Sequence, residues 1–292
     1  MSYAETSEFL KVALPVRRFD SRKGQNGVSS IIGGSEIYHG APALAALAAY
    51  RTGIDLVYLF VPQAVATAVR AISPSLIVHP FPGSRLTTGC AVRILARMPP
   101  VDSCVLGPGA GKQKPAGMRR IARELASRKV GLVIDADALQ SEVVRELGSN
   151  RVVLTPHPGE FKRITGIELT GSTGERVEAV RRTAKSLGVT ILVKGYIDII
   201  SDGGRVAVDR AGSPAMTVGE IGDVLSGIVG ALLAKGAEPF AAAAAAAYIT
   251  GKCGEMAAEK VGMRILPTDL IEELPAILKR YDVSLPATSP SA

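Results

Sequence analysis

Residues 103–134 read SCVLGPGAGKQKPAGMRRIARELASRKVGLVI, and this stretch decides the fold. It opens with an apolar run at 103–106, turns through several glycines, continues in a helical pattern at 115–128, and ends in a second apolar run at 130–134. Apolar runs of this length that end in polar residues, glycine or proline are typical of strands buried on both faces. A strand, a helix and a second such strand in succession predict a parallel βαβ unit.

The same alternation extends outward from this unit in both directions. Further strands are predicted at 29–32, 56–61, 76–78 and 152–154, and further helices at 42–51, 63–71, 88–97, 138–147 and 175–187. After these, apolar runs at 190–193, 197–200 and 206–208 follow one another through short turns, which is typical of antiparallel hairpins. Beyond 222 the chain is expected to be helical almost to 279. The sequence therefore predicts an α/β fold with a mostly parallel central sheet, helices on both faces and a short antiparallel edge.

Size and composition favour one large folded domain. The chain has 292 residues, of which 47% are hydrophobic, so it can bury a sizeable core. This excludes a disordered protein and a small disulfide-stapled scaffold. Residues 1–280 are expected to form the domain, and 281–292, rich in serine, threonine and proline, to form a flexible C-terminal tail.

Charge and cysteine usage narrow the class of partner. Lys and Arg number 34 against 27 acidic residues, but no run of five or six like charges occurs, so neither a nucleic-acid tail nor a nucleic-acid partner is expected. Solvated helix faces and weak steering of phosphorylated small molecules both explain the excess of +7. The three cysteines lack metal or redox spacing, which predicts free thiols in a reducing cytoplasm. The apolar stretch 240–249 is too short to span a bilayer, so no membrane association is expected.

Glycines cluster where ligands bind in open α/β sheets, at the carboxyl ends of strands. The first cluster, 107–111, follows the strand predicted at 103–106. Its glycines let the backbone approach a ligand closely and turn its amides inward. The spacing matches neither a Walker loop nor a dinucleotide fingerprint, so a plain tight turn is the alternative.

The second cluster, Gly219-Glu220-Ile221-Gly222-Asp223, precedes an apolar helix. Free amides and the helix dipole at such a start favour an anion. A carboxylate beside a phosphate weakens anion binding, so Asp223 is better explained as a base that takes a proton from a hydroxyl attacking that phosphate. The alternative is that Asp223 caps the helix.

The third constellation surrounds His157, which lies between two prolines after the strand at 152–154. The prolines stiffen the segment and hold the imidazole at a strand end. Glu160, in the first turn of the next helix, is placed to meet Mg²⁺ through water, or simply to complement the helix dipole. Lys194 ends another strand and either meets a phosphate or is solvated, and Asp135 and Asp137 are further candidates at a strand end.

Together these motifs resemble those of the ADP/ATP-dependent NAD(P)H-hydrate dehydratases, a branch of the ribokinase-like superfamily. The matching pieces run in order over about 27–260: Gly33-Gly34-Ser35 with Gly40-Ala41, the cluster 107–111, Asp135-Ala136-Asp137-Ala138-Leu139, Thr155-Pro156-His157-Pro158-Gly159-Glu160, Lys194-Gly195, and Gly222-Asp223-Val224-Leu225-Ser226-Gly227-Ile228. The His-Pro-Gly-Glu and Gly-Asp-Val-Leu-Ser-Gly-Ile pieces are the specific ones.

The resemblance implies a lyase that repairs damaged nicotinamide nucleotides. The hydroxyl of (S)-NAD(P)H hydrate is phosphorylated by ADP or ATP, and phosphate then leaves to regenerate NADH or NADPH. Asp223 contacts the hydrate and deprotonates it, and Ala41, Gly109 and His157 line the hydrate pocket. The nucleotide-binding residues that the resemblance implies are Lys194, Gly195, Tyr196, Ile197, Asp198, Gly219 and Gly222. It also implies Mg²⁺ and a homo-oligomer, specifically a tetramer.

Two departures from the family pattern bear on the nucleotide. Glu220 and Ile221 stand where the family usually carries Gly and Thr, which removes a hydroxyl donor, adds negative charge and predicts weaker nucleotide binding. The stretch Tyr196-Ile197-Asp198 differs from the small residue and Thr commonly found there. Two alternatives remain: a small-molecule kinase of the hydroxyethylthiazole or hydroxymethylpyrimidine type, and a catalytically silent nucleotide-binding protein.

Overall fold

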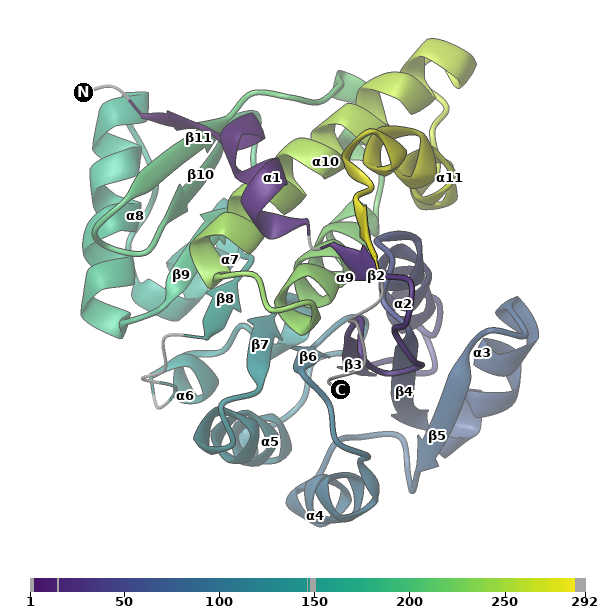
Figure 1. The fold of residues 1–292 in the computed structure, drawn as a ribbon. Helices are drawn as coiled ribbons and strands as arrows, with labels where there is room; N and C mark the ends of the chain where they lie inside the picture. The colour runs from purple at the N-terminus through teal and green to yellow at the C-terminus, as the bar shows by residue number, and fades with distance from the viewer. Residues whose placement is uncertain (1–2, 15, 146, 148–150, 287–292) are drawn as a thin grey trace, which may run out of the picture.

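The computed structural model describes residues 3–14, 16–145, 147 and 151–286, and within these a ten-stranded sheet carries the fold (Figure 1). Its parallel centre consists of β3 (Val28–Ile32), β4 (Leu56–Pro62), β5 (Ile77–Phe81), β6 (Ser103–Leu106), β7 (Gly131–Ile134), β8 (Val152–Leu154) and β9 (Thr190–Val193). The hairpin strands β10 (Asp198–Ser201) and β11 (Val206–Asp209) follow in antiparallel pairing. The order across the sheet is β1-β11-β10-β9-β8-β7-β6-β3-β4-β5, which confirms the predicted α/β class.

Helices cover both faces of this sheet. One face carries α1 (Leu10–Ala13), α2 (Ala41–Arg51), α3 (Ala66–Ile72), α9 (Ile221–Ala234), α10 (Pro239–Val261) and α11 (Pro267–Leu278). The other carries α4 (Thr88–Arg97), α5 (Ala116–Ser127), α6 (Ser141–Val144), α7 (Pro158–Thr165) and α8 (Thr173–Leu187). Short 3₁₀ turns occur at η1 (Thr6–Phe9), η2 (Gln63–Val65), η3 (Ala136–Ala138), η4 (Pro214–Thr217) and η5 (Lys279–Tyr281).

The strands contribute to both cores because successive side chains point to opposite faces. In β6, Val105 packs into the α9 and α10 side, whereas Cys104 and Leu106 pack into the α4 and α5 side. All three are fully buried. This two-sided burial explains why the strands show continuous apolar runs and not an apolar/polar alternation.

Small residues bring α9 close to its neighbours and so set where its N-terminus lies. A side chain at Gly227 would place its Cβ 2.2 Å from the backbone oxygen of Ala45 in α2. A Cβ at Gly230 would lie 2.5 Å from Val105 of β6. Glycine at both positions therefore allows α9 to lie directly against α2 and the sheet.

The predicted helix at 138–147 is wrong for most of its length. The structure has only η3, a non-helical Leu139, and the four-residue α6, while residue 146 lies outside the described ranges. Two local features keep this segment from being helical. Ala136 has a left-handed backbone with a φ of +50°, and the side-chain amide of Gln140 donates to the backbone oxygen of Asp137. The chain turns tightly at the strand end instead of continuing into a helix.

The edges of the sheet also differ from expectation. β5 extends to Phe81 through Pro80, which an edge strand tolerates because it lacks a second neighbour. At the opposite edge β1 (Ala4–Glu5) pairs in parallel with β11, so the antiparallel hairpin does not form the outermost edge. The hydroxyl of Thr6 donates to the carboxylate of Asp209 and ties this N-terminal segment to the sheet.

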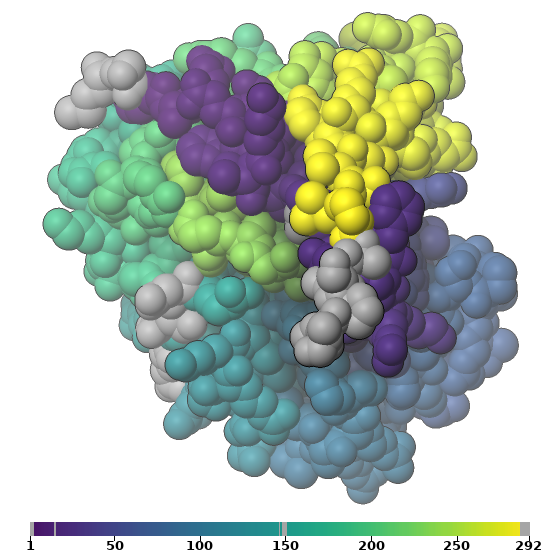
Figure 2. Space-filling view, in the orientation of Figure 1, coloured from purple at the N-terminus to yellow at the C-terminus, as the bar shows by residue number. Residues whose placement is uncertain are grey.

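A segment near each end of the chain takes part in a separate two-stranded sheet. β2 (Arg17–Arg18) pairs in parallel with β12 (Ser284–Leu285), and Figure 2 shows the purple and yellow segments in contact. The first six residues of the tail predicted at 281–292 thus include a paired strand, and 287–292 lie outside the described residues. No helix in the described part of the chain is long and apolar enough to cross a membrane.

Candidate active site

The carboxyl ends of β3, β6, β7, β8 and β9 lie at one edge of the sheet, because these strands are parallel neighbours. The segments that follow them contain the motifs singled out in the sequence. The N-terminus of α9 reaches the same edge, since the side chain of Lys194 after β9 contacts the position of Gly222. The fold therefore assembles residues that are far apart in the chain into one candidate site.

The glycine loop after β6 packs against the start of α2. Gly109 has a φ of +61°, and an added Cβ would lie 2.3 Å from the backbone oxygen of Tyr38 and 2.8 Å from Cβ of Ala41. Gly109 and Ala41, which the family resemblance assigns to one pocket, are thus in direct contact. The carboxylate of Asp137 accepts a 2.7 Å hydrogen bond from the amide of Gly111 and anchors the far end of the loop.

His157 and Glu160 form a reciprocal cap at the start of α7. Nδ1 of His157 accepts hydrogen bonds from the amides of Gly159 and Glu160, at 3.0 and 3.3 Å. The Glu160 carboxylate accepts from the His157 amide at 3.0 Å. Because Nδ1 is an acceptor, Nε2 carries the proton of the neutral ring. The His157 side chain is 57% exposed, so this N–H is available to a ligand at the strand end.

Glu160 therefore has the helix-start role that was the alternative to magnesium binding. Burial raises the pKa of its carboxyl, Lys194 opposes that shift, and Asp135 adds to it. Glu160 therefore interacts electrostatically with both Lys194 and Asp135. A magnesium role for Glu160 stays a prediction.

Lys194 and Asp135 form a buried ion pair at the centre of the site. Their Nζ and Oδ1 atoms are 2.9 Å apart, and the side chain of Asp135 is only 1% exposed against 20% for Lys194. The amine also lies 2.9 Å from the position that a Cβ on Gly222 would occupy. Lys194 is thus not a solvated surface lysine. It places a positive charge beside the first turn of α9.

Asp223 does not cap α9. The N-cap is Glu220, and no side chain bonds to the first amides of the helix. Asp223 is in the first turn and 8% exposed. Burial is the main cause that raises the pKa of its carboxyl to about 8; Asp135, Glu220 and Asp137 raise it further, while Lys194 lowers it. The carboxyl is surrounded by charged groups of the site and has no hydrogen-bond donor among the described residues, so it is free to act on a ligand.

The segment after Lys194 contains the other predicted nucleotide residues. The amide of Gly195 donates a 2.8 Å hydrogen bond to the carboxylate of Asp198, which closes the turn between β9 and β10. Burial raises the pKa of Asp198 to about 7. Ile197 is buried, whereas Tyr196 is 96% exposed at the tip of the turn. The structure therefore brings Lys194 and Gly222 together and leaves Tyr196 projecting into solvent.

Glycine would suit the start of α9 better than the glutamate that is present. Glu220 has a φ of +69°, a left-handed conformation that costs a side-chain-bearing residue about 1–2 kcal/mol. A Cβ at the neighbouring Gly219 would meet nothing within 4 Å, so the loop before α9 is open on that side.

Two features of the site were not predicted from the sequence. Tyr38, half-exposed between β3 and α2, contacts Gly109 although no motif distinguishes it. The pairing of Lys194 with Asp135 joins residues 59 positions apart, and only the adjacency of β7, β8 and β9 brings them together.

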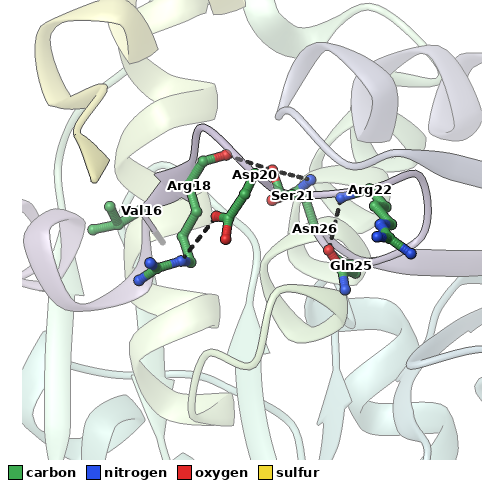
Figure 3. A pocket seen from close by; sticks show the side chains of 7 residues that line it. All are labelled: Val16, Arg18, Asp20, Ser21, Arg22, Gln25 and Asn26. Carbon is green, nitrogen blue, oxygen red and sulfur yellow. Dashed lines mark hydrogen bonds and ion pairs between the residues drawn. The ribbon is translucent and has the colours of Figure 1, made fainter. Parts of the chain in front are cut away.

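A broad hollow outside this site is formed by a turn of the chain between β2 and β3. It lies before β3, towards the amino ends of the strands, and is lined by Val16, Arg18, Asp20, Ser21, Arg22, Gln25 and Asn26 (Figure 3). Its polar groups bond to one another: Arg18 pairs with Asp20 at 3.2 Å, and the Arg22 amide donates to the Gln25 side chain at 2.7 Å.

Comparisons with known proteins agree with this geometry. A family model described as NAD(P)H-hydrate dehydratase matches residues 29–276. The chain is 42% identical over 278 residues to the ADP-dependent (S)-NAD(P)H-hydrate dehydratase of Nitrosopumilus maritimus, covering 95% of this chain and 97% of that protein. It is 44% identical over 270 residues to the protein of the same name from Cenarchaeum symbiosum, covering 92% and 94%. The ADP/ATP-dependent NAD(P)H-hydrate dehydratase of Bacillus subtilis, co-crystallized with ATP/Mg²⁺, matches with a TM-score of 0.81 at 25% identity, covering 97% of this chain and 100% of that one.

Proposed function

Because the chain belongs to the NAD(P)H-hydrate dehydratase family, we propose that it converts (S)-NAD(P)H hydrate to NAD(P)H at the expense of ADP or ATP, with Asp223 as general base. The observation that carries this assignment is the carboxyl of Asp223, which is buried in the first turn of α9, does not cap the helix, and is close enough to Lys194 for its pKa to be affected. ADP is favoured because both archaeal relatives are named ADP-dependent.

Asp223 takes the proton from the hydroxyl of the hydrate as that oxygen attacks the terminal phosphorus of the nucleotide. The bond from this phosphorus to the bridging oxygen breaks, and AMP leaves when ADP is the donor. Phosphate then departs from the ring carbon while a neighbouring ring proton is lost, which restores the double bond of the reduced nicotinamide. The amides at the start of α9 and the amine of Lys194 face the anionic groups throughout.

His157, Ala41 and Gly109 are proposed to line the hydrate pocket, and the turn from Lys194 to Asp198, with Gly219 and Gly222, to hold the nucleotide. The close contact of Gly109 with Ala41 and of Lys194 with Gly222 supports these two groupings. The exposed N–H of His157 adds a donor on the hydrate side.

The site fits Mg²⁺ if the nucleotide supplies part of the coordination. Within the described ranges, no three His, Cys, Asp or Glu side chains gather closely enough to hold an ion alone. Mg²⁺ is commonly bound by one or two carboxylates together with phosphate oxygens. Glu160 and Asp135 are the carboxylates proposed to approach it, Glu160 through water. When bound, the ion neutralises charge on the phosphate groups.

The enzyme is also proposed to be cytoplasmic and to form a homo-oligomer, a tetramer by family resemblance. Cys90, Cys104 and Cys253 are all buried free thiols, which suits a reducing compartment. Light scattering on the purified protein measures the assembly.

The deciding experiment mixes the protein with magnesium, hydrated NADH, and either ADP or ATP, and follows the return of reduced-nicotinamide absorbance. Repair predicts that the absorbance recovers and that free phosphate appears in equal amount. Accumulation of a stable phosphorylated substrate supports the small-molecule kinase instead, and nucleotide binding without turnover supports a silent binding protein. In the same assay Asp223→Asn should lose most of the activity, because it removes the proposed base. Asp282→Asn, which removes an exposed carboxylate outside the site, is its matched control.

A further inference from the structure

A small basic cavity lies between the edge strand β5 and α4, separate from the site described above. Its volume is about 60 Å³, enough for one small group, and it is lined by Phe60, His79, Pro80, Phe81, Pro82, Arg93, Ile94 and Arg97. None of these residues belongs to the proposed dehydratase machinery. β5 is three strands from β6, which carries the glycine loop.

His79 is fixed in this cavity by aromatic contacts. It is in register with Phe60 of β4, and the two rings stack with centroids 5.0 Å apart. Tyr58, two residues earlier on the same face of β4, meets the His79 ring edge-on at 5.6 Å. The Nε2 atom of His79 is buried and has no hydrogen-bond partner in the structure. Buried polar atoms are seldom left without a hydrogen bond, so we expect a ligand or an ordered water to bind this nitrogen.

The charged side chains other than His79 that line the cavity are two arginines. Arg93 and Arg97 lie four residues apart, hence on the same side of α4, and both line the cavity. Neither forms an ion pair with any carboxylate of the described residues. Arg70 of α3 donates to the backbone oxygen of Val78 at 3.3 Å, and its charge adds to burial in lowering the pKa of His79. Two arginine side chains and the unpaired Nε2 of His79 therefore line one cavity, and no acidic side chain of the described residues lines it.

We propose that this cavity binds a phosphate group, free or as a monoester, with Arg93, Arg97 and the His79 Nε2–H as its donors. Guanidinium groups are well suited to phosphate oxygens because they donate in a planar fork. Donors from both β5 and α4 suit a tetrahedral anion better than a flat carboxylate. Phe81 and Pro82 form an apolar wall against which the organic part of a monoester packs.

Binding is linked to protonation of His79. An anion in the cavity favours the charged imidazole, whereas burial and Arg70 oppose it in the free protein. Tyr58 is the other titratable group against this ring, and no acid faces it among the described residues. The bound protein consequently takes up a proton. Below about pH 6, where phosphate is already the monoanion, its binding therefore tightens as the pH falls towards the pKa of the free imidazole.

The test uses the full-length protein and inorganic phosphate, with chloride at equal ionic strength as the reference. The chain has only three histidines, His39, His79 and His157, so their imidazole NMR signals can be assigned by single substitution. We expect the His79 signal to shift and saturate with phosphate, with tighter binding as the pH falls below about 6. Arg93→Gln with Arg97→Gln should weaken this binding by about tenfold for each guanidinium removed.

Arg120→Gln is the matched control, because it removes one guanidinium from an exposed position on α5 that lines no part of the cavity. It should leave the His79 titration unchanged. An unshifted His79 signal in the wild-type protein, or equal saturation in the wild type and the double variant, overturns the proposal. Phenyl phosphate distinguishes the sources: tighter binding than inorganic phosphate identifies a monoester, and equal binding identifies free phosphate. Because the readout is a histidine signal, failure here leaves the dehydratase assignment untouched.

Discussion

Replacing Glu220 by glycine should make the protein both more stable and more active at neutral pH. Glu220 begins α9 with a φ of +69°, and its side chain makes no capping hydrogen bond that the substitution would remove. The backbone bond from the Asp223 amide to the oxygen of Glu220 is kept in the variant. The substitution thus relieves conformational strain and removes a negative charge near Asp223 without deleting a contact.

The stability gain follows from the backbone. A left-handed residue with a side chain costs about 1–2 kcal/mol, and the greater freedom of glycine in the unfolded chain offsets about 0.5–1 kcal/mol of that. A net gain of about 0.5–1 kcal/mol remains, which corresponds to a rise in Tm of roughly 2 °C for a domain of this size.

The gain in activity follows from the electrostatics. Glu220 contributes to the rise of the Asp223 pKa to about 8, after burial and Asp135. At pH 7 a base with that pKa is ionised in about one molecule in ten. Lowering the pKa therefore increases kcat/KM at pH 7, with a ceiling of about tenfold when the carboxyl is fully ionised. Removing the charge also favours the anionic nucleotide, so KM for ADP should fall.

The assay is a pH profile of kcat/KM between pH 6 and 9 together with thermal unfolding. Glu220→Gln is the control that separates the two effects, because it keeps the strained side chain and removes only the charge. We expect Gln to shift the pH profile without raising Tm, and Gly to do both. If Glu220→Gly left both the Tm and the pH profile where they are in the wild type, the reasoning about this position would be refuted.

Three further substitutions test the rest of the site. Asp223→Asn should lower kcat by about 10²- to 10⁴-fold. Folding raises the pKa of the Asp223 carboxyl from 3.8 to about 8, so the wild type loses stability as the pH rises between these two values, whereas the Asn variant does not. The variant should therefore have the higher Tm, by a margin that grows with pH, and an equal Tm of both proteins across this range in circular dichroism would contradict the prediction. Gly109→Ala should destabilise the protein and raise KM for the hydrate, because its Cβ would lie 2.3 Å from a backbone oxygen, whereas Gly40→Ala, with nothing within 4 Å, serves as the neutral control in the same kinetic assay. Lys194→Met should cost about 3–5 kcal/mol in urea unfolding, since it leaves the buried carboxylate of Asp135 unpaired. Adding Asp135→Asn should recover part of that stability, and strictly additive losses would show that the ion pair is unimportant.

Much of the architecture could be predicted because its signals are local. The strands at 103–106 and 190–193 match the predicted bounds, since apolar runs of this length, flanked by turn residues and rich in β-branched side chains, favour buried strands. The prediction of a helix at 138–147 was wrong. The side chain of Gln140 bonds to the nearby backbone oxygen of Asp137, which competes with the helix, and the carboxylate of Asp137 is held by the amide of Gly111 in the glycine loop. The N-terminal strand β1 carries too little periodicity to be predicted and forms only because β11 offers it a free edge.

For the candidate site, the sequence alone determined which segments are candidates for the chemistry: the glycine loop, the His157 to Glu160 cap and the start of α9 are each encoded by adjacent residues. Only the tertiary structure decided how their side chains interact. It paired Lys194 with Asp135, placed that amine beside Gly222, and buried Asp223 among carboxylates that raise its pKa. The physical reason is that conformational preferences act over a few residues, whereas burial and Coulomb interactions depend on distances in space, which are set by the order of strands in the sheet.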